Sequence, residues 1–128
     1  MNLLLDTHLL LWAAEGNLPS EAAKYIDDTR NTLFFSVASM WEIAIKNSLG
    51  RSDFFVDPSS LYRGLLDAGY IELEIKGRHT LLVSSLPLLH KDPFDRLLLA
   101  QSAHEGIPLL TADKAIAQYP GSVIFVRP

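Results

Sequence analysis

Short apolar runs alternate along the chain with segments that have the apolar spacing of helices. The runs at 3–5 and 33–35 are typical of strands that are buried on both faces, as in a parallel sheet. Further strands are predicted at 107–111 and 123–126, and the apolar–acidic alternation over 70–75 predicts a half-exposed strand at a sheet edge. We therefore expect an α/β fold, a three-layer α/β/α sandwich around a mostly parallel sheet of about five strands.

Helix ends are marked by residue types with known positional preferences. The predicted helices begin at side chains that can cap a helix N-terminus, namely Asp6, Ser20, Ser36, Asp57 and Asp92. Glycines follow three of the predicted helices, at Gly50, Gly69 and Gly106. A shorter and more weakly marked helix is predicted over 79–86, before Pro87.

The composition suits a single soluble domain over residues 1–128. Of the 128 residues, 48% are hydrophobic and 20% are charged, which is enough to build one core. The absence of cysteine excludes disulfides and thiolate metal sites, and it fits a cytoplasmic protein. The apolar N-terminus has no basic region and is interrupted by Asp6 and His8, so we expect neither a signal peptide nor a membrane span.

The formal net charge of −4 bears on the choice of partner. Proteins that rely on non-specific contacts with phosphates are usually basic. If this protein handles nucleic acid, a bound cation or a local basic patch must offset its acidity.

Four acidic side chains fall where strands end or helices begin. Asp6 and Asp113 each follow a predicted strand. Asp95 lies in the first turn of a predicted helix, and Glu42 lies in the second turn of a helix that directly follows a strand. Because strand C-termini and the helix N-termini that follow them share one edge of a parallel sheet, the four carboxylates could converge on one cleft.

Convergence of four carboxylates would carry an electrostatic cost. Two unit charges about 4–5 Å apart repel by roughly 3–4 kcal/mol at an effective dielectric constant of about 20. Either some of the groups take up protons, or a divalent cation lies among them. Oxygen ligands favour Mg²⁺ or Mn²⁺ over Zn²⁺, and such an ion suits hydrolysis of a phosphodiester.

Each acid also has a purely structural interpretation. Asp6 and Asp113 are plausible helix caps, and Asp95 lies where an acid can complete a capping box or oppose the helix dipole. Glu42 precedes Lys46 by four residues, which is the favourable order for a surface ion pair, although apolar residues surround it in the sequence. Asp92, directly before a proline, is assigned to capping.

Other candidate residues carry weaker signals. The histidines have no metal-ligand spacing, and they are His8, His79, His90 and His104. The aromatic residues expected in the core are Trp12, Phe34, Trp41 and Phe94. Lys46 and Arg96 flank the proposed acids and could contact RNA phosphates, although surface solubility would explain either of them alone.

Four motifs in order resemble the PIN-domain family. They are Leu-Leu-Leu-Asp-Thr-His ending at His8, Ser-Val-Ala-Ser-Met-Trp-Glu-Ile-Ala-Ile-Lys over 36–46, Asp-Pro-Phe-Asp-Arg-Leu-Leu over 92–98, and Leu-Thr-Ala-Asp over 110–113. The chain is most similar to the VapC-type toxins of bacterial and archaeal toxin–antitoxin pairs. The resemblance spans nearly the whole chain.

The resemblance implies a three-layer α/β/α fold and a magnesium-dependent endoribonuclease. By position, the family's acidic quartet is Asp6, Glu42, Asp95 and Asp113, with Asp6 and Asp95 as the metal ligands. The resemblance also implies RNA as substrate, a homodimer and a cognate antitoxin that blocks the acidic cleft. Phe54 and Phe55 could belong to a partner surface, or could pack under the connector in which they lie.

Two other functions stay open at this point. One is a magnesium-dependent phosphotransfer domain of the phosphatase or receiver kind. It fits poorly, because His8 stands where such a phosphatase needs a second Asp, and no Lys follows the last strand, as a receiver would need. The other is a catalytically silent PIN-like module that binds RNA or protein.

Overall fold

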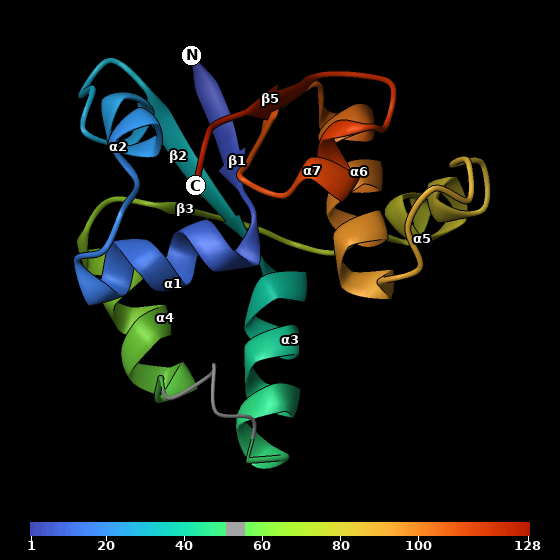
Figure 1. The fold of residues 1–128 in the computed structure, drawn as a ribbon. Helices are drawn as coiled ribbons and strands as arrows, with labels where there is room; N and C mark the ends of the chain where they lie inside the picture. The colour runs from blue at the N-terminus through green and yellow to red at the C-terminus, as the bar shows by residue number, and fades with distance from the viewer. Residues whose placement is uncertain (51–55) are drawn as a thin grey trace.

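A single parallel sheet organises the protein in the computed structural model, which describes residues 1–50 and 56–128 (Figure 1). Its strands are β1 (Asn2–Leu5), β2 (Thr32–Ser36), β3 (Ile71–Leu73), β4 (Leu109–Thr111) and β5 (Val123–Phe125). The strand order is β3-β2-β1-β4-β5, and every neighbouring pair is parallel. The predicted α/β class is confirmed, and β3 is the half-exposed edge strand that the alternation at 70–75 indicated.

Helices cover both faces of the sheet. They are α1 (Thr7–Glu15), α2 (Ser20–Ile26), α3 (Val37–Ser48), α4 (Pro58–Asp67), α5 (Gly77–Val83), α6 (Pro93–Glu105) and α7 (Lys114–Ala117). Helices α1, α2 and α4 lie on one side of the sheet in Figure 1, and α5, α6 and α7 lie on the other. No helix among the described residues is long and apolar enough to cross a membrane.

Alternation along the central strand produces the two cores. Leu3 and Leu5 point into a cluster that includes residues of α1, α2 and α4, whereas Leu4 points into a cluster with α6 and α7. All three leucines are fully buried. A strand with a helical layer on each face has no polar side, which explains why β1 reads as an unbroken apolar run.

The topology creates a crevice beside β1. From β1 the chain moves outward through β2 to β3, and it then returns to the other side of β1 to form β4 and β5. The adjacent strands β1 and β4 therefore lead into α1 and α7, which lie on opposite faces of the sheet. Ligands of open α/β sheets bind at such a reversal, outside the strand C-termini. Asp6 directly follows β1, and Asp113 lies two residues after the end of β4.

Most of the predicted caps are confirmed. Carboxylate oxygens of Asp6, Asp57 and Asp92 and the hydroxyl of Ser36 each accept a backbone N–H bond at the start of their helices. The prediction for Ser20 is wrong, because Pro19 occupies the cap position of α2 and no side chain bonds there.

The weakly marked helix begins earlier than predicted, at Gly77 rather than residue 79. The backbone N–H of Lys76 donates to Nδ1 of His79, whose side chain is fully buried. A histidine therefore closes the start of α5. It is not one of the usual capping residues, so the sequence carried little signal for this helix end.

Trp41 corrects the predicted core. Trp41 is 55% exposed, although it was expected to be buried with the other large aromatic residues. Helix α3 extends beyond the C-terminal edge of the sheet (Figure 1), so one flank of it has no layer to cover it. There Trp41 packs edge-on against Phe94, with ring centroids 5.2 Å apart. Trp12 and Phe34 pack at the margins of the two cores.

Candidate functional site

Asp6 is held at the end of β1 by two hydrogen bonds. Its Oδ1 accepts the backbone N–H of Leu9 at 2.9 Å, and its Oδ2 accepts the hydroxyl of Thr111 at 2.5 Å. The residue is 3% exposed. Burial raises the pKa of Asp6, and the nearby Asp113 carboxylate adds to the rise, whereas the two hydrogen bonds oppose it. Capping and site membership are therefore compatible for this carboxylate.

Glu42 is buried in the second turn of α3. Thr7, the first residue of α1, donates its hydroxyl to Glu42 Oε1 at 2.7 Å and lies 2.9 Å from the hydroxyl of Ser39. Lys46 Nζ lies 2.5 Å from Glu42 Oε2. The predicted ion pair therefore forms, but it is not a surface pair, because Glu42 is only 2% exposed.

Asp95 lies in the first turn of α6, where Asp92 caps the helix. Its Oδ2 lies 2.8 Å from Nε2 of His90 in the preceding loop. Burial raises the pKa of Asp95 to about 6. The His90 hydrogen bond opposes that rise, and the carboxylates of Asp92 and Glu42 add to it.

Asp113 follows β4 and begins α7. Its Oδ1 accepts the backbone N–H of Ala115 at 2.8 Å, and its own N–H donates to the hydroxyl of Thr111 at 3.0 Å. Thr111 thus bonds to both Asp6 and Asp113. This one hydroxyl ties together the two segments that leave β1 and β4.

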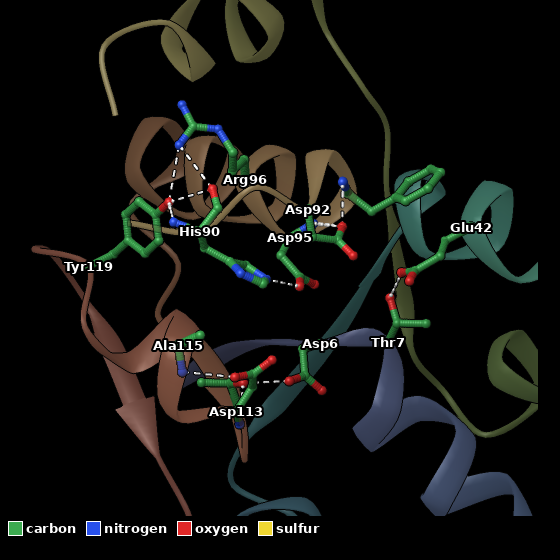
Figure 2. Close-up of polar contacts among 12 residues, drawn as sticks. Asp6, Thr7, Glu42, His90, Asp92, Asp95, Arg96, Asp113, Ala115 and Tyr119 are labelled. Atoms are coloured by element: carbon green, nitrogen blue, oxygen red, sulfur yellow. Dashed lines mark hydrogen bonds and ion pairs between the residues drawn. The ribbon is translucent and has the colours of Figure 1, made fainter. Parts of the chain in front are cut away.

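The four predicted acids come together at the C-terminal edge of the sheet. Figure 2 shows the Asp95 carboxylate pointing toward those of Asp6 and Asp113, with Glu42 beside Thr7 at the flank. Asp6 is close enough to Asp113, and Asp95 to Glu42, for each neighbour to raise its pKa. Ligand atoms of Asp95 and Asp113 lie within 4.8 Å of one another and link the two pairs. We call these four residues the acidic cluster. A shallow pocket adjoins it, lined by Asp6, His8, Trp12, Ala112, Asp113, Lys114 and Pro128.

The donor atoms of this region fit a hard divalent cation. Ligand atoms of His90, Asp95 and Asp113 all lie within 4.8 Å of one another. Carboxylate oxygens are the ligands that Mg²⁺ and Mn²⁺ prefer. The raised pKa values of Asp6 and Asp95 mean that each holds a proton more tightly than an isolated carboxylate does. A cation at this place would relieve the same electrostatic cost that these protons relieve.

Arg96 departs from its predicted place on the surface. It is 8% exposed, and its guanidinium donates to the backbone carbonyls of Val83 and Pro87, each at 2.9 Å. The surface-solubility interpretation is therefore wrong for Arg96, and its donors are used within the chain. Lys46 lies beside the acidic cluster, paired with Glu42. Phe54 and Phe55 lie outside the described residues.

A second group of possible metal ligands serves as a contact between two helices. Ligand atoms of His79, His104 and Glu105 lie within 4.8 Å of one another at the far end of α6. Nδ1 of His79 accepts the Lys76 N–H, so the proton of the neutral ring is on Nε2, which lies 2.8 Å from Glu105. His79 then has no lone pair to offer a metal. Its hydrogen bond lowers the pKa of Glu105 and ties α5 to α6.

Three residues of the site were not assigned a role from sequence. Thr7 and Thr111 bond to Glu42 and Asp6, and His90 bonds to Asp95. The only available signal was position, because each threonine lies within two residues of a predicted acid. His90 precedes Asp95 by five residues, which is not a helical spacing, so only the loop geometry brings the two together.

The family follows from these motifs and this geometry. A model of the PIN domain matches residues 3–122. The chain belongs to the PIN domain family. No curated protein matches it.

Solved structures share the PIN fold over nearly the whole chain. The VapBC2 complex of Rickettsia felis, bound to a DNA fragment from its promoter, matches with a TM-score of 0.73 and 16% identity, covering 99% of this chain and 98% of that chain. DNA-bound VapBC from Salmonella typhimurium gives 0.68 and 11%, covering 98% of each. VapBC-1 from Haemophilus influenzae gives 0.61 and 18%, covering 92% and 91%. At these identities the likeness establishes the fold.

Proposed function

We propose that this PIN domain is a magnesium-dependent endoribonuclease and the toxin of a toxin–antitoxin pair. The observation that carries the proposal is the acidic cluster at the C-terminal ends of β1 and β4, together with the raised pKa values of Asp6 and Asp95. Family membership supports the nuclease chemistry. Similarity in fold to VapBC and other toxin–antitoxin complexes supports the biological role.

The residues of the acidic cluster and the neighbouring Lys46 have different roles in the proposed reaction. Asp6 and Asp95 hold the cation, and Glu42 and Asp113 complete the acidic site. When bound, Mg²⁺, or Mn²⁺ in its place, supplies the Lewis-acid chemistry for hydrolysis of an RNA phosphodiester. Lys46, paired with Glu42, places a positive charge at the edge of the cluster. In this proposal that charge contacts an RNA phosphate. Because the net charge of the chain is −4, such local contacts and the cation must provide the attraction for RNA.

Asp6→Asn tests the proposal directly. Purified wild-type protein should cleave single-stranded RNA with Mg²⁺ and lose that activity with a chelator. Asp6→Asn should lose more than about 100-fold in rate, because even changes behind a metal ligand cost about 10–100-fold. RNA cleavage is followed on a gel, and folding is followed by circular dichroism.

Asp57→Asn is the matched control. Asp57 caps α4 as Asp6 caps α1, but it is exposed and outside the acidic cluster. The Asp57→Asn variant should cleave RNA at the wild-type rate. Wild-type cleavage by folded Asp6→Asn would contradict the role of Asp6. A wild type that neither binds Mg²⁺ nor cleaves RNA would favour the silent binding module.

The toxin role has its own test in cells. Expression of the wild-type chain should arrest growth, and co-expression of the product of the adjacent gene should restore it. Asp6→Asn should not arrest growth. Growth arrest that persists unchanged in Asp6→Asn would separate toxicity from the acidic cluster and contradict the proposed toxin mechanism.

An apolar surface on α3 and α5 supports a homodimer. Trp41 on α3 is 55% exposed, and Leu81 on α5 is 74% exposed. A shallow apolar pocket has Trp41 in its lining, together with Thr80, Val83, Pro93, Phe94 and Leu97. Leu81 lies on the same helix as Thr80 and Val83. Exposed apolar surface of this kind marks an interaction site. We assign this α3–α5 surface to a second copy of the chain.

A further inference from the structure

Arg96 organises the loop that joins α5 to α6. Its guanidinium donates to the carbonyl of Val83, the last residue of α5, and to the carbonyl of Pro87 in the loop. A buried cation is costly unless its donors are satisfied, and here backbone oxygens satisfy them. Arg96 therefore fixes the path of the chain between the end of α5 and the start of α6.

Tyr119 connects this arginine to His90. Its phenol oxygen accepts a bond from Arg96 Nη1 at 3.0 Å and one from the backbone N–H of His90 at 2.9 Å. The same hydroxyl donates to the carbonyl of His90 at 3.1 Å. The backbone N–H and C=O of His90 are thus both bonded to the phenol of Tyr119 (Figure 2). Tyr119 is buried and lies two residues after the end of α7. We call Arg96 and Tyr119 the clamp.

The ring of His90 points from the clamp toward the acidic cluster. Its Nε2 lies 2.8 Å from Oδ2 of Asp95, as Figure 2 shows. Metal-binding carboxylates are commonly oriented by a second hydrogen bond of this kind. With one oxygen bonded to His90, the Asp95 carboxylate cannot rotate without losing that bond.

We propose that the clamp of Arg96 and Tyr119 positions His90, and that His90 orients Asp95 to bind a divalent cation. This inference rests on the proposed function, because it takes Asp95 to be a metal ligand. In this inference His90 does not bind the cation itself; it positions Asp95, which does.

Binding of Mn²⁺ alone, without RNA, tests the inference on the full chain by calorimetry. His90→Ala should weaken Mn²⁺ affinity by about 10–100-fold. His90→Gln keeps an N–H donor near the position of Nε2 and should recover most of that affinity. Tyr119→Phe removes only the hydroxyl and should weaken binding in the same direction, by less than His90→Ala does.

His104→Gln is the matched control, because it changes a partly exposed histidine on α6, the helix that carries Asp95, beside a different carboxylate. It should leave Mn²⁺ affinity unchanged. Circular dichroism establishes that each variant is folded. Folded His90→Ala with wild-type affinity would overturn the inference, as would His90→Gln that binds no better than His90→Ala.

Pulsed electron paramagnetic resonance of the Mn²⁺-loaded wild type separates positioning from direct coordination. We expect no coupling to a directly bound imidazole nitrogen. A strong ¹⁴N coupling that disappears in His90→Gln would make His90 a metal ligand and overturn its positioning role. If the wild type binds no Mn²⁺, the proposed function fails as well. If the wild type binds Mn²⁺ and cleaves RNA but His90→Ala binds equally well, only the inference fails.

Discussion

Single carboxylates in this protein serve the fold and the site together. Asp6 uses Oδ1 to cap α1 and Oδ2 to accept the Thr111 hydroxyl, and it also borders Asp113. Asp113 similarly caps α7 with one oxygen. For these residues the structural interpretation from sequence was correct and does not argue against a role in the acidic cluster.

The titration of Asp95 predicts an unusual dependence of stability on pH in the metal-free protein. Its pKa is raised from 3.8 to about 6, so the folded state binds more protons than the unfolded state between these values. The free energy of unfolding should therefore fall as pH rises from about 4 to about 6. The difference corresponds to roughly 3 kcal/mol.

Urea denaturation in chelator, from about pH 4 to about pH 8, measures this dependence. Asp95→Asn should remove the part that belongs to Asp95, while the raised pKa of Asp6 keeps a part in the same direction. Stability that instead increases steadily over this range in the wild type would contradict the assigned pKa direction.

The acids could be predicted from sequence because one rule covers them all. Each lies just after a strand or within the first two turns of a helix, and a parallel sheet gathers such positions at one edge. Their partners could not be predicted, since Thr7 meets Glu42 and Thr111 meets Asp6 only through the packing of distant segments. Arg96 was misread for a related reason. Its acceptors are mostly backbone carbonyls, and these are present at every residue, so the sequence does not mark them.

At the scale of elements, α6 depends on the Asp92 cap. Asp92 Oδ1 accepts the backbone N–H groups of Phe94 and Asp95, so the cap also fixes the turn that carries Asp95. Asp92→Ala should lower the free energy of unfolding by about 1 kcal/mol and weaken Mg²⁺ binding. Both are measured on purified protein, by urea denaturation and by calorimetry.

Two comparisons make this prediction specific. Asp92→Ser keeps a capping oxygen and should retain most of the stability. Asp57→Ala removes a similar cap from α4, so it should lose similar stability without affecting Mg²⁺ binding. Equal loss of Mg²⁺ affinity in Asp57→Ala and Asp92→Ala would mean that general destabilisation, rather than the α6 turn, is the cause.

Elements were predicted well where local chemistry defines them. The Asp-Pro starts of α4 and α6 were read correctly because cap and first helical residue are adjacent. The start of α5 was not, because the buried ring of His79 closes it. Trp41 could not be placed from its own helix, since its exposure depends on how far α3 extends past the sheet.

At the scale of the whole molecule, the α3–α5 surface predicts self-association. Light scattering of the wild type should give twice the chain mass. Trp41→Glu or Leu81→Glu should give the monomer, because a charge would have to be buried against an apolar surface. Leu66→Glu introduces the same charge at an exposed leucine on α4 and should remain a dimer. A monomeric wild type at working concentrations would refute this assignment.

The hydrogen bond from Thr111 to Asp6 joins positions that are 105 apart in the chain. Closing so long a stretch of chain costs conformational entropy, which slows the formation of such contacts. A nascent or partly unfolded molecule therefore lacks the paired segments that gather the carboxylates. The proposed nuclease would then become active only once β4 has paired with β1, and an incompletely folded chain would not cleave RNA.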